Sequence, residues 1–287
     1  MPDPDLARSV DAAQSILATP AAEQARHLER ALAEGAAEIA RTMARLDPAS
    51  GASALEIAGG FAIFAGAGSP LTQGLGMGLG GPVSAPELDA MEAHLRPGGQ
   101  GSVQLEICPF AHPSLPALLA ERGYRVHEWQ LVWTCALDAA PREPVTTPDP
   151  QLSVRRIRAG EEDTYLRAIL AGFLESETVP DDALALMRPT TATPRHEAFL
   201  ALLGDAPAGG GGLSYQGEIA FISGSGVRPA FRRRGAQGAL LQARLARARE
   251  VGCRVASSST LPGTASRRNM DRAGFQVAYP KLLMLRG

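Results

Sequence analysis

The chain has 287 residues, 45% of them hydrophobic, and a formal net charge of −2. This length exceeds what one hydrophobic core usually organises, so we expect two domains of roughly 140 residues each. The near-neutral charge provides no overall field to attract nucleic acid, no apolar run reaches the roughly 18 residues of a membrane span, and no secretory signal core is recognisable. We therefore expect a cytoplasmic protein with neither a membrane nor a nucleic acid as partner.

Cysteine and lysine usage narrows the possible chemistry. Cys108, Cys135 and Cys253 lack the spacing of a metal knuckle or a redox dithiol, so we predict three small buried side chains and no metal site. Lys281 is the only lysine, and every other cationic side chain is an arginine. Guanidinium groups do not lose a proton at working pH, which excludes them as general bases.

The first half of the chain alternates helical and strand patterns. Residues 9–46 are rich in alanine, leucine, glutamate and arginine, which predicts two helices separated at Pro20. Short apolar runs between glycines within 54–84 predict strands. The remaining patterns predict a helix at 85–95, a strand at 103–108, a helix at 112–123 and a strand pair over 124–137.

A linker divides the sequence. Residues 139–150 hold four prolines and no periodic hydrophobic pattern, so we predict a linker at 141–150 between domains at 1–140 and 151–287. After it the order of patterns repeats. We predict strands at 152–157, 198–203, 207–213, 218–223 and 255–259, helices around 166–173, at 239–250 and at 264–273, and a closing strand or hairpin at 276–285 interrupted at Pro280. The fold class is α/β (α+β).

One segment, 227–241, combines a strand end, a basic turn and glycines at the start of a helix. The first amides of a helix have no partner within it, and the helix dipole makes that end partly positive, so a diphosphate is well matched to it. Gly235 and Gly238 lack a Cβ and allow close approach to phosphate oxygens. The alternative is an ordinary strand-to-helix turn with solvated arginines. A nucleoside-triphosphate loop and a dinucleotide fingerprint both fit poorly, because no Gly-Lys-Ser/Thr follows and a meander precedes.

The same segment resembles the hallmark of the GNAT superfamily of acyl-CoA N-acyltransferases. Arg232-x-x-Gly235 matches the hallmark, although its third position is Gln237, with Gly238 directly after. The surrounding residues that also match are Val227, Pro229, Phe231, Leu240 and Leu241. Downstream, the segment 272–275, Arg-Ala-Gly-Phe, is similar to the helix-ending Gly-Phe signature of that family.

This resemblance implies two GNAT-like domains, each a mixed, mostly antiparallel central sheet flanked by helices. It implies acetyl-CoA as the acyl donor and direct transfer to an amine without a metal. A splayed strand at 225–227 would pair with the pantetheine arm. The cofactor-binding residues that it implies are Ser225, Gly226, Val227, Arg232, Arg233, Arg234, Gly235, Ala236, Gln237, Gly238, Ala239, Ser266 and Asn269.

Proton transfer has less obvious candidates. The tyrosine that usually protonates the departing thiolate in this family is replaced here by Met270, so Tyr279 becomes the candidate acid, with a packed aromatic as the alternative. Glu218 is the candidate base, with a solvated turn residue as the alternative.

The first half resembles a degenerate copy of the same fold, with a structural or substrate-lining role that completes the acceptor pocket. Its glycine run at 74–81 suits either a phosphate loop or close packing of small residues. His112, His127 and Glu128 have no metal-type spacing and are expected at the surface.

The sequence therefore predicts an acetyl-CoA-dependent N-acetyltransferase acting on a small amine. Two alternatives stay open. One is a non-catalytic acyl-CoA-binding sensor or scaffold, which Met270 favours. The other is a nucleic-acid face formed by the arginines at 232–234, 244, 247 and 249. The sequence sets no oligomeric state.

Overall fold

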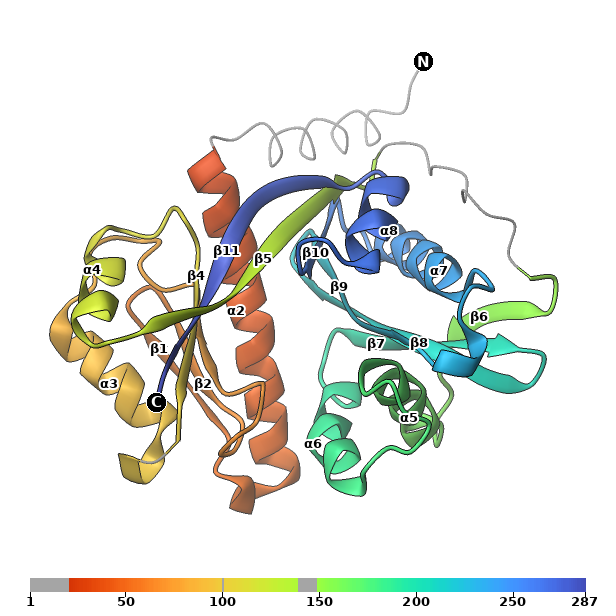
Figure 1. The fold of residues 1–287 in the computed structure, drawn as a ribbon, viewed down its shortest axis with the longest axis horizontal. Helices are drawn as coiled ribbons and strands as arrows, with labels where there is room; N and C mark the ends of the chain where they lie inside the picture. The colour runs from red at the N-terminus through yellow and green to blue at the C-terminus, as the bar shows by residue number, and fades with distance from the viewer. Residues whose placement is uncertain (1–20, 100, 139–148) are drawn as a thin grey trace. The chain divides into compact units, whose positions relative to one another are not determined.

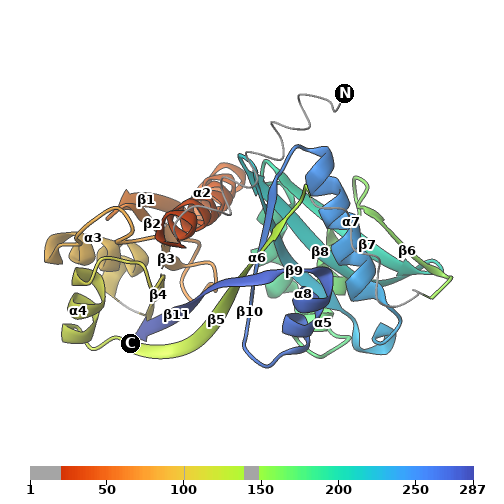
Figure 2. The same cartoon turned by 90° about the horizontal axis from the view of Figure 1, so that it is seen from above.

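The structure is a computed structural model that describes residues 21–99, 101–138 and 149–287. These residues form two compact units. The N-terminal unit contains residues 21–133, 259–263 and 277–287, and the C-terminal unit contains the described part of 134–258 together with 264–276. Each is a mostly antiparallel sheet flanked by helices, which confirms the predicted α/β class (Figures 1 and 2).

The N-terminal unit has its strands in the order β1-β2-β3-β4-β11-β5. All of its recorded pairings are antiparallel except the parallel pair β3–β4. The closing strand β11 comes from the C-terminal end of the chain. The elements of this unit are α2 (Ala21–Leu46), η1 (Pro48–Ser50), β1 (Ser53–Ile57), β2 (Gly60–Phe64), β3 (Gln73–Leu75), α3 (Ala85–Leu95), η2 (Pro97–Gly99), β4 (Val103–Ile107), α4 (Ser114–Glu121) and most of β5 (Arg125–Ala136) and β11 (Gln276–Arg286).

Both faces of this first sheet are covered, because successive strand residues point to opposite sides. Phe61 and Ile63 of β2 pack with the alanines of α2, whereas Ala62 between them packs with α3 and α4. Figure 1 shows α2 on one side of strands β1–β4 and α3 and α4 on the other. Within the glycine run at 74–81, Gly74 packs closely, since a Cβ on it would lie 2.4 Å from the Leu105 side chain, whereas a Cβ on Gly80 or Gly81 would meet no atom within 4 Å.

The C-terminal unit has its strands in the order β10-β9-β8-β7-β6, with a single parallel pair, β9–β10. Figure 1 shows α5 and α6 on one face of these strands and α7 on the other. The elements are β6 (Leu152–Arg156), α5 (Glu162–Phe173), α6 (Asp181–Thr191), β7 (His196–Leu203), β8 (Ala206–Gln216), β9 (Ile219–Val227), η3 (Pro229–Phe231), α7 (Ala236–Glu250), β10 (Val255–Thr260) and α8 (Ala265–Ala273).

Glycines set how closely the helices approach this second sheet. A Cβ on Gly226 of β9 would lie 2.3 Å from the carbonyl oxygen of Ile169 in α5. A Cβ on Gly210 of β8 would lie 2.9 Å from the ring of Tyr165 in the same helix. Side chains at these positions would push α5 away from the sheet.

Several predicted elements need correction. Residues 124–137 form one long strand, β5, rather than a strand pair, and β11 continues through Pro280 without interruption. Helix α6 had not been predicted, and α7 begins three residues earlier than expected, at Ala236. The predicted first helix, up to residue 19, and residues 141–148 of the predicted linker lie outside the described residues.

Candidate cofactor site

The loop that joins β9 to α7 makes a tight turn with two residues in left-handed conformation. Strand β9 ends at Val227, and η3 leads to Arg232. Arg233 has a φ of 62° and Gly235, the residue that precedes α7, has a φ of 83°. Glycine adopts this conformation without the penalty that a Cβ causes. The turn therefore delivers the chain into α7 with its first amides pointing out of the helix start.

Four consecutive amides at this helix start have no hydrogen-bond acceptor within the described part of the protein. They are the N–H groups of Gly235, Ala236, Gln237 and Gly238, and the first bond of the helix runs from the amide of Ala239 to the carbonyl oxygen of Gly235 at 3.0 Å. No side chain caps this end. A helix start with unpaired amides, together with the positive end of the helix dipole, is suited to bind an anion.

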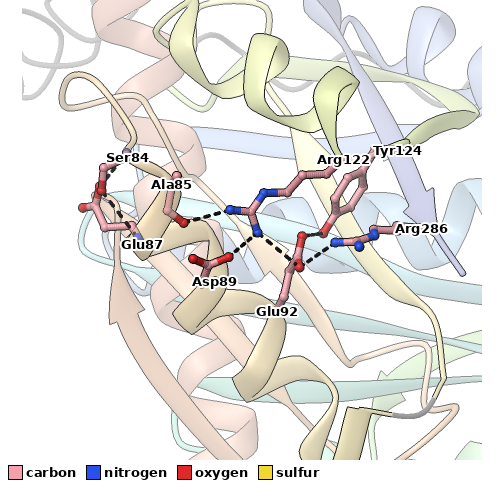
Figure 3. A network of polar contacts seen from close by, with 8 residues as sticks. All are labelled: Ser84, Ala85, Glu87, Asp89, Glu92, Arg122, Tyr124 and Arg286. Atoms are coloured by element: carbon pink, nitrogen blue, oxygen red, sulfur yellow. Dashed lines mark hydrogen bonds and ion pairs between the residues drawn. The ribbon is translucent and has the colours of Figure 1, made fainter.

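The corresponding helix of the N-terminal unit, α3, starts differently. Ser84 accepts a hydrogen bond from the amide of Glu87, and the Glu87 carboxylate accepts from the Ser84 amide at 2.8 Å, which makes a capping box (Figure 3). The side chains of Ser84 and Glu87 thus accept hydrogen bonds from backbone N–H groups at this helix start, and the Glu87 carboxylate places a negative charge there. A phosphate would compete with Glu87, so the start of α3 offers no comparable position.

Two of the three predicted arginines are held by acidic side chains. The guanidinium of Arg232 donates to both carboxylate oxygens of Glu175, at 2.6 and 2.7 Å, and to the carbonyl oxygen of Gly172 at 3.2 Å. Hydrogen bonds from Arg232 lower the pKa of Glu175. Arg234 donates to Asp149 at 3.2 Å, and Arg233 is exposed. The positive charge beside the amides is therefore partly neutralised in this structure.

Strand β9 diverges from β10 part-way along its length. The paired register between them covers Ile219 to Phe221. At the next residue, Ser258 of β10 donates its hydroxyl hydrogen to the carbonyl oxygen of Ile222 at 2.8 Å. The predicted residues Ser225, Gly226 and Val227 follow this divergence. In the described register Gly226 and Val227 pair with β8, and no pairing of these two residues with β10 is recorded.

The predicted proton-transfer residues lie apart from this loop. Glu218 precedes β9, is about half exposed, and forms an ion pair with Arg254 at 3.0 Å. Tyr279 belongs to the N-terminal unit, is buried, and donates its phenol hydrogen to Glu29 at 2.9 Å. Burial, together with the negative charge of Glu29, raises the pKa of Tyr279 far above its ordinary value. On α8, Ser266 is exposed, Asn269 is half-buried and Met270 is buried.

Lys281 also belongs to a buried charged cluster of the N-terminal unit. Its ammonium group donates to Glu106 and lies 3.6 Å from Glu29, the carboxylate that accepts from Tyr279. Burial raises the pKa of Glu29, although the charge of Lys281 opposes that rise. A second cluster joins Glu92 to Tyr124, Arg122 and Arg286 (Figure 3). Both clusters join β11 to the rest of its unit.

Sequence reasoning missed two buried basic groups of the C-terminal unit, the guanidinium of Arg244 and the ring nitrogen Nε2 of His196. Arg244 on α7 had been counted in a possible nucleic-acid face, yet it is completely buried, and burial lowers its pKa to about 10. Arg247 pairs with Glu197 and Glu250, so these arginines do not form a free basic face. The ring of His196 is largely buried, which lowers its pKa to about 4. Neither residue stands in a motif that would have revealed its burial.

The described residues thus combine a mixed α/β fold with an uncapped helix start, that of α7, which follows a diverging strand. A family model described as acetyltransferase (GNAT) family matches residues 163–275.

Solved structures show the same fold. A GCN5-related N-acetyltransferase from Sphaerobacter thermophilus is 22% identical with a TM-score of 0.55, covering 75% of this chain and 71% of that one. One from Kribbella flavida is 15% identical with a TM-score of 0.55, covering 85% and 94%. A tandem GNAT protein from the clavulanic acid biosynthesis pathway is 14% identical with a TM-score of 0.53, covering 70% and 68%. No curated protein sequence matches the chain.

Proposed function

We propose that the protein is an acetyl-CoA-dependent N-acetyltransferase that transfers the acetyl group directly to a small amine. One observation carries this proposal: four adjacent amides at the start of α7 have no acceptor within the described residues, and they lie inside the segment that the GNAT family model matches. A diphosphate supplies the acceptors that these donors lack.

The residues present fit coenzyme A in two further respects. Gly238 is exposed, and a Cβ built on it would meet no atom within 4 Å, so a ligand can approach the backbone at this position. Beyond Ile222, whose carbonyl oxygen accepts from Ser258, no pairing of β9 with β10 is recorded, and there we propose that the amide groups of a pantetheine arm pair with β9. Bound acetyl-CoA would supply an activated acetyl group as its thioester. The protein would hold its diphosphate through the amides of 235–238, with Arg233 nearby and with Ser266 and Asn269 of α8 as further polar candidates.

For proton transfer we keep Glu218 as the proposed base, since it is exposed and stands at the start of the strand that diverges. We set Tyr279 aside as the acid, because its phenol is buried and donates to Glu29. Met270 has no proton to donate, so the departing thiolate must be protonated by water or by another side chain.

A titration and a turnover assay test the proposal together. We expect calorimetry to show that the wild-type protein binds coenzyme A and does not bind NADH. We also expect acetyl-CoA to release free thiol when the right amine from a panel is added. Glu218→Gln should slow this release without changing the affinity for coenzyme A. Binding without amine-dependent release over a broad panel would indicate the sensor instead, and failure to bind coenzyme A would refute both.

We further propose that residues 1–140, completed by the returning segment 277–287, form a degenerate GNAT-like domain with a structural role, that the C-terminal unit carries catalysis, and that 141–150 is the linker between them. The self-capped start of α3 supports the first part. The helices of the described residues include none that is both long and apolar enough for a membrane span. We propose that the protein acts in the cytoplasm.

A further inference from the structure

Arg244 lies in the middle of α7 with its whole side chain buried, yet no carboxylate in the described part of the chain pairs with it. Its Nε donates to the carbonyl oxygen of Leu240 in its own helix at 2.9 Å. Its Nη1 donates to two carbonyl oxygens of the sheet, those of Gly212 and Ser223, each at 3.1 Å. A buried cation costs free energy unless it is well partnered, so this arrangement needs a reason beyond packing.

The two carbonyl groups mark an irregularity in the sheet. Gly212 of β8 and Ser223 of β9 are paired, and the next recorded pair is Gly210 with Gly226. Two steps along β8 thus correspond to three along β9, so β9 carries one extra residue. Gly224, at the extra position, has a φ of 56°. This is a β-bulge, which bends its strand and releases backbone groups from the ladder.

Strand β8 makes room for the guanidinium at this point. A Cβ on Gly211 would lie 2.7 Å from the Cζ atom of Arg244, closer than real contacts allow. Gly211 is therefore required for Arg244 to reach the two carbonyl groups. A side chain at 211 would force the guanidinium away from the bulge.

The bulge is also where β9 leaves β10. Its last recorded pair with β10 is at Phe221, and Ser223 is two residues further on. Arg244 thus bonds α7, the helix whose start offers the free amides, to the part of β9 for which no pairing with β10 is recorded. A guanidinium with donors in a fixed plane can set this spacing, because it holds one carbonyl group from each strand.

We infer that Arg244 is a positioning residue for acyl-CoA binding, because it fixes the β9 bulge relative to the start of α7. This inference rests on the proposed function. Arg244 has no role in binding the diphosphate itself, so its loss should affect the pantetheine half of coenzyme A and spare the nucleotide half. A residue that only supports folding would affect both halves equally.

Calorimetric titration of each variant with two ligands tests the inference. One ligand is coenzyme A, and the other is its nucleotide half alone, 3′-phospho-ADP. Arg244→Gln cannot hold both carbonyl groups, and Gly211→Ala displaces the guanidinium. Each should weaken coenzyme A binding about tenfold and change binding of the nucleotide half by less than about twofold. The double variant should bind no more weakly than Arg244→Gln alone, since both changes remove one interaction.

Arg247→Gln is the matched control, because Arg247 lies on the same helix but its recorded partners are the carboxylates of Glu197 and Glu250. It should change neither affinity. Unchanged coenzyme A binding in Arg244→Gln, or an equal loss of both ligands, overturns the inference while leaving the proposed function intact. If Arg244→Gln does not fold, Gly211→Ala gives the same comparison. A wild-type protein that binds neither ligand refutes the proposed function, and the inference falls with it.

Discussion

Replacement of Gly235 by alanine tests the loop geometry most sharply. Gly235 has a φ of 83° and directly precedes α7. An alanine in this left-handed conformation is strained by about 1–2 kcal/mol, which sets the upper limit for the loss of folding stability. The unbound loop can release the strain by changing conformation, which misdirects the amides. Binding of coenzyme A must then restore the strained conformation, so the affinity for coenzyme A should fall by up to about 5- to 30-fold.

Gly252 provides a control at the other end of the same helix. Its φ is 85° and its surroundings are open, so Gly252→Ala should cause a similar strain and a similar loss of stability. It lies far from the loop and should leave coenzyme A affinity unchanged. Thermal unfolding and calorimetry on both variants make the comparison. If Gly235→Ala binds coenzyme A as tightly as Gly252→Ala, the conformation of Gly235 does not position the amides and the reasoning is refuted.

Three further predictions concern charged groups. Glu175→Gln frees Arg232 from its acidic partner, so coenzyme A should bind severalfold more tightly in a calorimetric titration, and weaker binding would show that this ion pair supports the site. The pKa of His196 is about 4 in the folded protein and 6.5 ordinarily. Between pH 4 and pH 6.5 this side chain therefore binds more protons in the unfolded chain than in the folded protein. Stability should fall by on the order of 2 kcal/mol as the pH drops from 6.5 to 4, and His196→Gln should abolish that loss in denaturant melts. Lys281→Met leaves two buried carboxylates without their cation, which should destabilise the fold by about 3–5 kcal/mol in denaturant melts. The affinity for coenzyme A should be retained. A loss of stability well below that range would mean that the cluster contributes little.

The local parts of this molecule could be predicted from the sequence, because their signals are local. The helix at 85–95 has its cap, its proline and its apolar spacing within a dozen residues, and it was predicted with the bounds that the structure shows. The loop at 232–238 was predicted as an uncapped helix start because glycines and arginines stand together in the chain. The structure adds that the turn uses left-handed conformations at Arg233 and Gly235.

The remaining features depend on contacts between distant residues. Glu175 lies 57 positions from Arg232, and nothing in either local pattern indicates their ion pair. Arg244 stands among other arginines on a helix, and only the three-dimensional arrangement of β8 and β9 shows that it is buried. Tyr279 was predicted near the cofactor from its position after the Gly-Phe signature. Its strand instead packs within the N-terminal unit, where Glu29, 250 positions away, accepts a hydrogen bond from its phenol.

Amide NMR of the labelled protein examines the helix start directly. If the N–H groups of residues 235–238 bind a diphosphate, their four signals will move when coenzyme A is added, and again with its nucleotide half alone. Signals at the start of α3, which its own capping box satisfies, will stay in place. Saturable binding of coenzyme A with no movement of those four signals would contradict the account.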